Sequence, residues 1–165
     1  MNFKRIMRHL SSGNAAVRRA FPRSALDAIE RAIRAAEGQH SGQIRFAVEA
    51  ALDMTPLLAG QSAHERALEV FSQLRVWDTE HNNGVLIYLL LADRDVEIIA
   101  DRGVHAKLAR EIWEMICHEM EAAFRQGKFE QGVIAGIHSV SLQLAQHYPP
   151  VGVKANELAD QPVVL

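Results

Sequence analysis

A continuous run of seven apolar residues, Val85 to Leu91 (VLIYLLL), constrains the fold more than any other feature of the chain. Polar turn residues bound this run on both sides, at 81–84 and at Asp93-Arg94. The run is far shorter than the roughly 20 apolar residues that cross a bilayer. Its length and composition are typical of a strand that is buried on both faces. We therefore expect a central strand covered by helices on both sides.

Hydrophobic periodicity predicts the elements around this strand. Residues 43–50 (QIRFAVEA) alternate apolar and polar side chains, which predicts a strand with one buried face. Residues 95–100 (DVEIIA) predict the hairpin partner of the central strand. Apolar side chains at helical spacing predict helices over 1–10, 15–20, 24–38, 62–74, 107–126 and 129–147, with 52–60 as an irregular link. An acidic residue three positions after Ser24 and after Ser62 predicts a capping box at each.

The order of these elements predicts the topology. A helix between the first strand and the central strand favours a parallel pair, and the hairpin adds an antiparallel strand. The predicted fold class is α/β, with a small mixed β-sheet sandwiched between α-helices in a single domain. We expect residues 1–20 to form a basic amphipathic arm, 21–148 the α/β domain and 149–165 a flexible tail.

Charge is distributed unevenly along the chain. Residues 1–23 contain 6 basic and no acidic side chains, whereas the remainder contains 12 basic and 20 acidic ones. An acidic body disfavours nucleic acid as a partner. The arm is either an exposed helix kept soluble by its charge, or a docking element for an anionic membrane surface or an acidic partner. The docking residues would be Lys4, Arg5, Arg8, Arg18 and Arg19.

The remaining composition restricts the chemistry. One cysteine, Cys117, excludes an internal disulfide framework and a multi-cysteine metal site, and we expect it to pack in the core like Trp113. Phosphate-binding loops, dinucleotide fingerprints, zincin helices and nucleophile elbows have no match in the sequence. The N-terminus lacks the apolar segment of a secretory signal, so we expect a cytoplasmic protein, peripheral to a membrane if the arm docks there.

The stretch from Leu74 to Gly103, with its Trp77, Asn82-Asn83-Gly84 loop, apolar strand and Asp93-Arg94 turn, resembles the TPM domain family. A second motif, AFRQGKF at 123–129 followed by Gly132, is similar to a helix junction of that family. The resemblance covers about 22–147. It implies an α/β/α sandwich and no single activity: some members are acid phosphatases, some bind divalent metals, and others are accessory proteins of membrane complexes or receptors. Similarity to a branch associated with LemA-type membrane proteins implies a LemA-like, membrane-associated partner.

The resemblance directs attention to the loops before the central strand and after its hairpin partner. An anion such as a phosphate group would contact Arg75, Asn82, Asn83 and Arg102, with Asp78 or Asp101 as nucleophile or base. A divalent cation (Ca²⁺, Mg²⁺ or Zn²⁺) would use Asp78, His81, Asp101 and His105.

The chain departs from the family at two acidic positions, which hold Asn82 and His105 here. This loss of negative charge weakens the case for a hard cation. Two hypotheses follow from the sequence. The first is a non-enzymatic accessory or binding module that docks through the arm, and the alternative is a weak metal-dependent phosphatase that hydrolyses phosphomonoesters.

Overall fold

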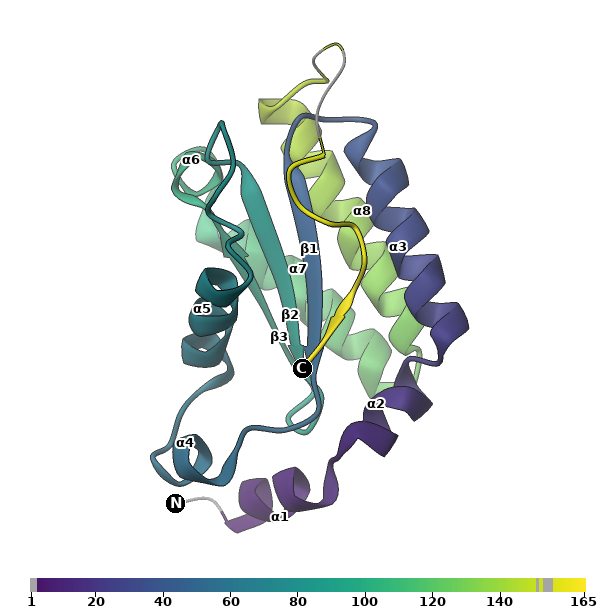
Figure 1. Ribbon diagram of the computed structural model, residues 1–165, viewed down its shortest axis with the longest axis vertical. Helices are drawn as coiled ribbons and strands as arrows, with labels where there is room; N and C mark the ends of the chain where they lie inside the picture. The colour runs from purple at the N-terminus through teal and green to yellow at the C-terminus, as the bar shows by residue number, and fades with distance from the viewer. Residues whose placement is uncertain (1–2, 151, 153–155) are drawn as a thin grey trace.

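The computed structural model describes residues 3–150, 152 and 156–165. Its strands form one sheet in the order β3-β2-β1-β4 (Figure 1). The strands are β1 (Gln43–Glu49), β2 (Gly84–Leu90), β3 (Asp95–Ala100) and β4 (Val163–Val164). Strands β1 and β2 pair in parallel from Gln43↔Gly84 to Glu49↔Leu90. Strands β2 and β3 pair in antiparallel orientation. The predicted parallel pair and hairpin are confirmed.

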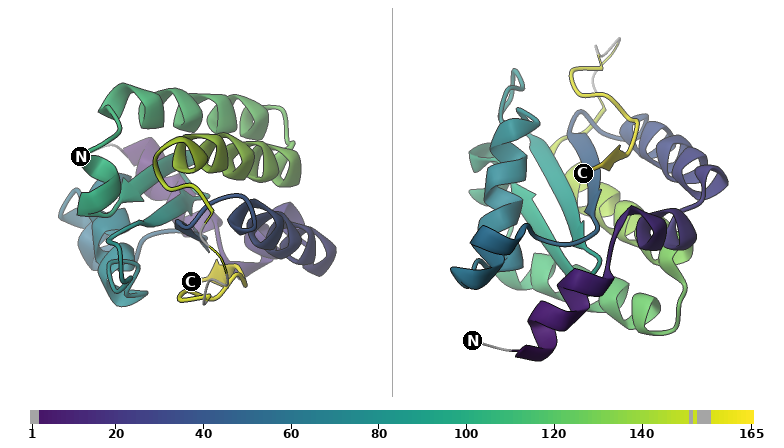
Figure 2. Two further views of the ribbon diagram at one scale, coloured as in Figure 1. Left: turned by 90° about the horizontal axis from the view of Figure 1, so that it is seen from above. Right: turned by 60° about the horizontal axis from the view of Figure 1, so that its bottom comes forward.

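Helices cover both faces of the sheet (Figure 2). The helices are α1 (Phe3–Ser11), α2 (Asn14–Ala20), α3 (Arg23–Glu37), α4 (Met54–Leu58), α5 (Ala63–Gln73), α6 (Arg102–His105), α7 (Arg110–Arg125) and α8 (Phe129–His147). One apolar cluster joins α3, α7 and α8 to the sheet, and a second joins α5 and the C-terminal segment to its other face. The predicted α/β/α sandwich is confirmed.

Strand β2 is buried at every position, as the apolar run predicts. Val85, Ile87 and Leu89 belong to the first cluster, whereas Leu86, Tyr88 and Leu90 belong to the second. Side chains alternate between the two faces of a strand, so an uninterrupted apolar sequence requires cover on both sides. Within the described residues, helices from both layers supply that cover.

Strand β1 differs from its expected half-buried state, because only Arg45 is less than fully buried. Polar residues at its two ends, Gln43 and Glu49, lie inside the protein. One cause is the C-terminal segment 149–165, expected to be a flexible tail, of which residues 149, 150, 152 and 156–165 are described. Ala47 and Val48 of β1 pair with Val163 and Val164 of β4, and the Leu165 N–H donates to the Val48 carbonyl at 2.9 Å. Apolar, β-branched residues at the end of the chain therefore extend the sheet.

Of the two capping boxes predicted at helix starts, the structure contains one and lacks the other. The capping box at Ser62 and Glu65 is present, with both reciprocal hydrogen bonds. The one predicted at Ser24 is wrong, because α3 begins at Arg23 after Pro22, which takes the N-cap position. Proline fixes φ near the helical value, and α3 begins two residues earlier than an N-cap at Ser24 would place it. The link at 52–60 contains the short helix α4.

The predicted arm corresponds to α1 and α2, although residues 1 and 2 lie outside the described part. None of the described helices is both long enough and apolar enough to cross a membrane.

Gly84 offers a test of how tightly the loop before β2 is packed. A Cβ at this position would overlap the backbone carbonyl oxygen of Val76, which cannot move as a side chain can. We expect Gly84→Ala to lower the free energy of unfolding by about 3 kcal/mol. Gly13→Ala is the control, because a Cβ there meets nothing within 4 Å. Urea unfolding measures the free energy of unfolding of both variants. Equal values would contradict the close approach of Gly84 to the Val76 carbonyl.

Candidate functional site

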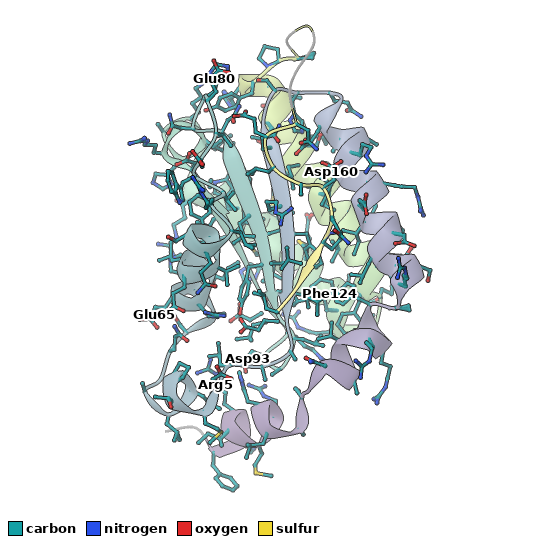
Figure 3. The ribbon with its side chains drawn as sticks, viewed as in Figure 1. Arg5, Glu65, Glu80, Asp93, Phe124 and Asp160 are labelled. Atoms are coloured by element: carbon teal, nitrogen blue, oxygen red, sulfur yellow. The ribbon has the colours of Figure 1, made fainter. Side chains whose placement is uncertain are left out.

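Buried polar residues gather at the edge of the sheet where β1 and β2 begin and β3 ends. Glu80, labelled in Figure 3, marks the loop at this end of the molecule. The buried polar residues here are His40, Ser41, Gln43, Thr79, Asn83 and Asp101. Burial of a polar group is unfavourable unless it is hydrogen-bonded, so such a concentration needs a structural or a functional explanation.

Asn83 is fully buried and joins three segments of this edge. Its side-chain Nδ2 donates to the Ser41 carbonyl at 2.9 Å, and its backbone N–H donates to Oγ1 of Thr79 at 3.1 Å. Its carbonyl accepts from the Gln43 N–H at 3.2 Å. These bonds account for the turn that an Asn-Asn-Gly sequence predicts. Oδ1 of Asn83, however, has no hydrogen-bond partner within the described residues.

Asp101 is the buried carboxylate of the same edge. Its N–H donates to the Gly84 carbonyl at 2.9 Å, and its Oδ1 accepts from the Arg102 N–H at 2.7 Å at the start of α6. Oδ2 is buried and lacks a partner in the part of the chain that the structure describes. Burial, followed by the nearby charge of Asp101, raises the pKa of Tyr148. One oxygen of Asp101 thus caps α6, and the other is buried without a hydrogen-bond partner among the described residues.

The two loops singled out by the sequence do meet. The Gly103 N–H donates to the Asn82 carbonyl at 3.1 Å, and Nε of Arg102 donates to Oδ1 of Asn82 at 2.9 Å. A Cβ at Gly103 would lie 2.5 Å from that same carbonyl oxygen. Asn82 itself has a φ of 50°, a left-handed conformation that asparagine tolerates. Asn82, Asn83, Asp101 and Arg102 therefore share one site.

Asp78 and Arg75 form a separate pair. Nη2 of Arg75 lies 2.7 Å from Oδ2 of Asp78, and both side chains are exposed. They line a groove of about 330 Å³ together with Arg45 and residues 157–159 of the C-terminal segment. Asp78 is thus exposed beside a cation and lines this groove, which Asp101 does not line.

The predicted metal ligands are likewise dispersed. His81 is exposed, and His105 is an exposed residue of α6 that lines a groove beside β3. No group of three or more His, Cys, Asp or Glu side chains is arranged to hold a metal ion among the residues described. Asp101 and Asn83 alone supply fewer oxygen ligands than Ca²⁺ or Mg²⁺ prefers, so the predicted ligand set does not fit a resident divalent cation.

Comparison with known proteins identifies the family of this fold. A profile of the TPM domain matches residues 18–143. The chain belongs to the TPM domain family. The solution structure of the BA42 protein from the psychrophilic bacterium Bizionia argentinensis is similar, with a TM-score of 0.75 and 30% identity over 86% of this chain and 92% of that one.

A second similar structure is the N-terminal domain of a protein from P. gingivalis. Its TM-score is 0.57 at 20% identity, over 74% of this chain and 76% of that one, so it shows the fold alone. No curated protein matches. The matched range of the TPM domain begins at residue 18, and α1 therefore precedes it.

Helix α1 is joined to the TPM domain by a charged cluster that the sequence did not reveal. Asp93, in the turn after β2, lies 2.8 Å from Nε of Arg5, 2.7 Å from Nη2 of Arg8 and 3.1 Å from Nε2 of His9. Figure 3 shows Arg5 and Asp93 close together at the end of the molecule where α1 lies. His9 is buried, and its Nδ1 accepts the Leu52 N–H at 3.0 Å. Two of the predicted docking residues, Arg5 and Arg8, thus hold α1 in place.

We expect the carboxylate of Asp93 to stabilise the packing of α1 against the TPM domain. Burial raises the pKa of Asp93, but hydrogen bonds from Arg5 and His9 outweigh burial and hold that pKa below its usual range. Asp93→Asn should lower the free energy of unfolding by about 2 kcal/mol at neutral pH and speed amide exchange in α1. A lowered pKa stabilises the fold above the unfolded-state pKa of about 4, and this contribution disappears as the pH falls through the folded-state value.

The stability difference between Asp93→Asn and the original protein should therefore shrink in acid. Asp53→Asn is the matched control, because the Asp53 side chain is exposed and does not cap α4. Unchanged amide exchange in α1 of the Asp93 variant would show that the cluster does not hold the helix.

Proposed function

We propose that this TPM domain is a non-enzymatic accessory module that docks on an anionic membrane surface through α1, as a cytoplasmic protein peripheral to the membrane. The observation that carries this proposal is the outward face of α1. Phe3, Met7 and Leu10 are 71%, 50% and 60% exposed, although all three are large and apolar. Their spacing of four and three residues places them on one side of the helix.

The same helix has an inward face that fixes its orientation. Ile6 packs against the apolar cluster that contains α5, and Arg5 and His9 contact Asp93. The apolar stripe expected from the sequence is therefore divided, with Ile6 inside and its neighbours outside. An apolar row that faces water is unfavourable unless a partner covers it, which supports a docking role.

Further exposed residues at this end extend the surface. Met54 and Leu58 of α4 are 43% and 52% exposed, and α4 lies near α1 at the same end of the molecule (Figure 1). Lys4 is exposed on α1, as are Arg18 and Arg19 on α2. Each basic residue close to an anionic leaflet contributes about 1 kcal/mol, and each apolar side chain that inserts contributes about the same or more.

A membrane-associated, LemA-like protein is a second way of covering this surface. We favour the lipid surface because exposed cations flank an exposed apolar row, the pattern of interfacial helices. The non-enzymatic part of the proposal is supported by the exposure of Asp78, whose carboxylate is paired with Arg75, and by the lack of a metal-binding cluster of His, Cys, Asp and Glu among the described residues.

Sedimentation with vesicles tests the docking. We expect the protein to sediment with vesicles rich in phosphatidylglycerol and not with phosphatidylcholine vesicles. The double variant Phe3→Ser, Met7→Ser should reduce the bound fraction roughly tenfold, since two inserting side chains are lost. Met115→Ser, which removes a 55% exposed methionine from α7, is the matched control. Equal binding of the variant and the control would refute docking through α1, and binding to neither vesicle would exclude the lipid surface.

Phosphomonoester hydrolysis is the second candidate, and one observation favours it. Oδ2 of Asp101 and Oδ1 of Asn83 are buried polar atoms that have no hydrogen-bond partner among the described residues, at the site where Arg102 also lies. Unsatisfied buried oxygens are unfavourable for stability and are common where a ligand binds.

A generic phosphate ester, assayed with and without Ca²⁺, Mg²⁺ or Zn²⁺, tests this candidate. If the protein is a phosphatase, Asp101→Asn should abolish turnover while the fold is retained, and Asp78→Asn should leave it unchanged, because Asp78 is exposed and paired with Arg75. The accessory proposal instead expects no turnover and no shift of melting temperature with any of these ions.

A further inference from the structure

Strand β3 is an outer strand of the sheet, and a groove of about 710 Å³ follows it. All six residues of β3 line the groove. Its two walls are α5, which contributes His64 and Leu68, and α7, which contributes Trp113, Cys117 and others. Neither Asp101 nor any residue of α1 lines the groove, and the functions proposed above do not use it.

The pairing of β3 with β2 determines which backbone groups face the groove. The Asp101 N–H donates to the Gly84 carbonyl, and in an antiparallel ladder every second residue repeats this orientation. Ile99, Glu97 and Asp95 therefore bond to β2. The N–H and carbonyl groups of Val96, Ile98 and Ala100 point to the outer side, where no further strand pairs with β3 in the described residues. The thiol of Cys117 contacts the backbone of Ile98 there, and a thiol is only a weak acceptor.

Trp113 provides an independent sign of a missing partner. The residue lines the groove from α7 and is 6% exposed. Its indole Nε1–H is buried and has no acceptor among the residues described. A buried indole N–H normally has an acceptor, and a backbone carbonyl of an added strand would supply one.

The groove is acidic at neutral pH. Asp95, Glu97, Glu114 and Glu121 line it, and among its described lining residues Arg110 is the one arginine or lysine. Arg110 lies 2.7 Å from Glu114, His64 contacts Glu97, and His118 and Arg125 contact Glu121. Asp95 has no such ion pair within the part of the chain that the structure describes. Burial, and then the charges of Glu97, Glu121 and Asp93, raises the pKa of Asp95 to about 6, although Arg5 opposes this.

We propose that this groove binds an extended, basic segment of a partner protein, which adds to the sheet as a strand beside β3. The backbone of the segment would bond to Val96, Ile98 and Ala100. Side chains of an added strand alternate between the two faces, so basic residues would lie beside Asp95 and Glu97, and apolar residues beside Ile98 and Trp113.

Charge decides between this occupant and a second copy of the chain. Two β3 strands paired with each other would bring the acidic residues of both copies into one interface, which is unfavourable. A basic segment instead neutralises them. The preferred sequence alternates β-branched and basic residues, since β-branched residues suit a strand.

The probe is a short dye-labelled peptide that alternates valine with lysine. Fluorescence anisotropy with the full chain should show saturable binding of this peptide. A peptide that alternates valine with glutamate should bind at least tenfold more weakly because it repels the groove. The lysine peptide with a central proline should also bind more weakly, because proline cannot donate to a strand.

Variants of the protein locate the site. The double variant Asp95→Asn, Glu97→Gln should weaken binding of the lysine peptide several-fold while the fold is retained, since both changes keep the side-chain shape. Glu119→Gln is the matched control, because Glu119 is an exposed residue of α7 that does not line the groove. Amide exchange at Val96, Ile98 and Ala100 should slow when the peptide is bound.

Each outcome decides the proposal. Equal affinity for the lysine and glutamate peptides, or unchanged affinity with the central proline, would overturn it, as would the absence of binding. A concentration-dependent dimer whose β3 amides are protected without peptide would show that a second copy occupies the edge, which also overturns it. None of these outcomes depends on α1 or on vesicle binding.

Discussion

The parallel pairing of β1 with β2 is the constraint on which the rest of the structure depends. Both strands are buried, so each face needs a layer of helices, and a parallel pair needs a long connection to return the chain to the same end. Helix α5 lies in that connection, and α3, α7 and α8 cover the other face. The parallel arrangement also places the polar starts of both strands at one edge, where Asn83 bonds to Ser41 and Gln43.

The sequence predicted the parts of the fold that depend on local pattern. The run from Val85 to Leu91 indicated the central strand, and Ser62 with Glu65 indicated a helix start. What it missed depends on contacts between distant segments. The alternation in β1 suggested an exposed face because Arg45 and Glu49 are charged. Yet Glu49 is buried, since Arg66 pairs with it at 2.9 Å and Tyr88 donates to it at 2.6 Å. Nothing local indicates that Val163 pairs with Ala47.

At the candidate site, too, the sequence predicted what depends on local pattern and missed contacts between distant segments. Asn82 and Asp101 were correctly placed together, because the loops that hold them adjoin neighbouring strands of one hairpin. Asp78 is exposed and paired with Arg75, and the structure shows no contact between it and Asp101 among the described residues. The contact of Asp93 with His9 joins residues 84 positions apart in the sequence, which no motif reveals. The one local signal was the position of Asp93 in the turn after the buried parallel strand β2, since the ends of such strands are common binding positions.

The contacts of Asp93 also change what the basic arm can contribute to docking. Six cations without acidic neighbours suggest strong attraction to an anionic surface, but Arg5 is 20% exposed and paired, and Arg8 shares the same carboxylate. The charge left for a lipid surface is therefore smaller than the sequence implies. Phe3, Met7 and Leu10 must then supply much of the binding energy. Because added salt screens charges and does not weaken apolar insertion, docking of this kind depends less on ionic strength than docking by a polybasic segment.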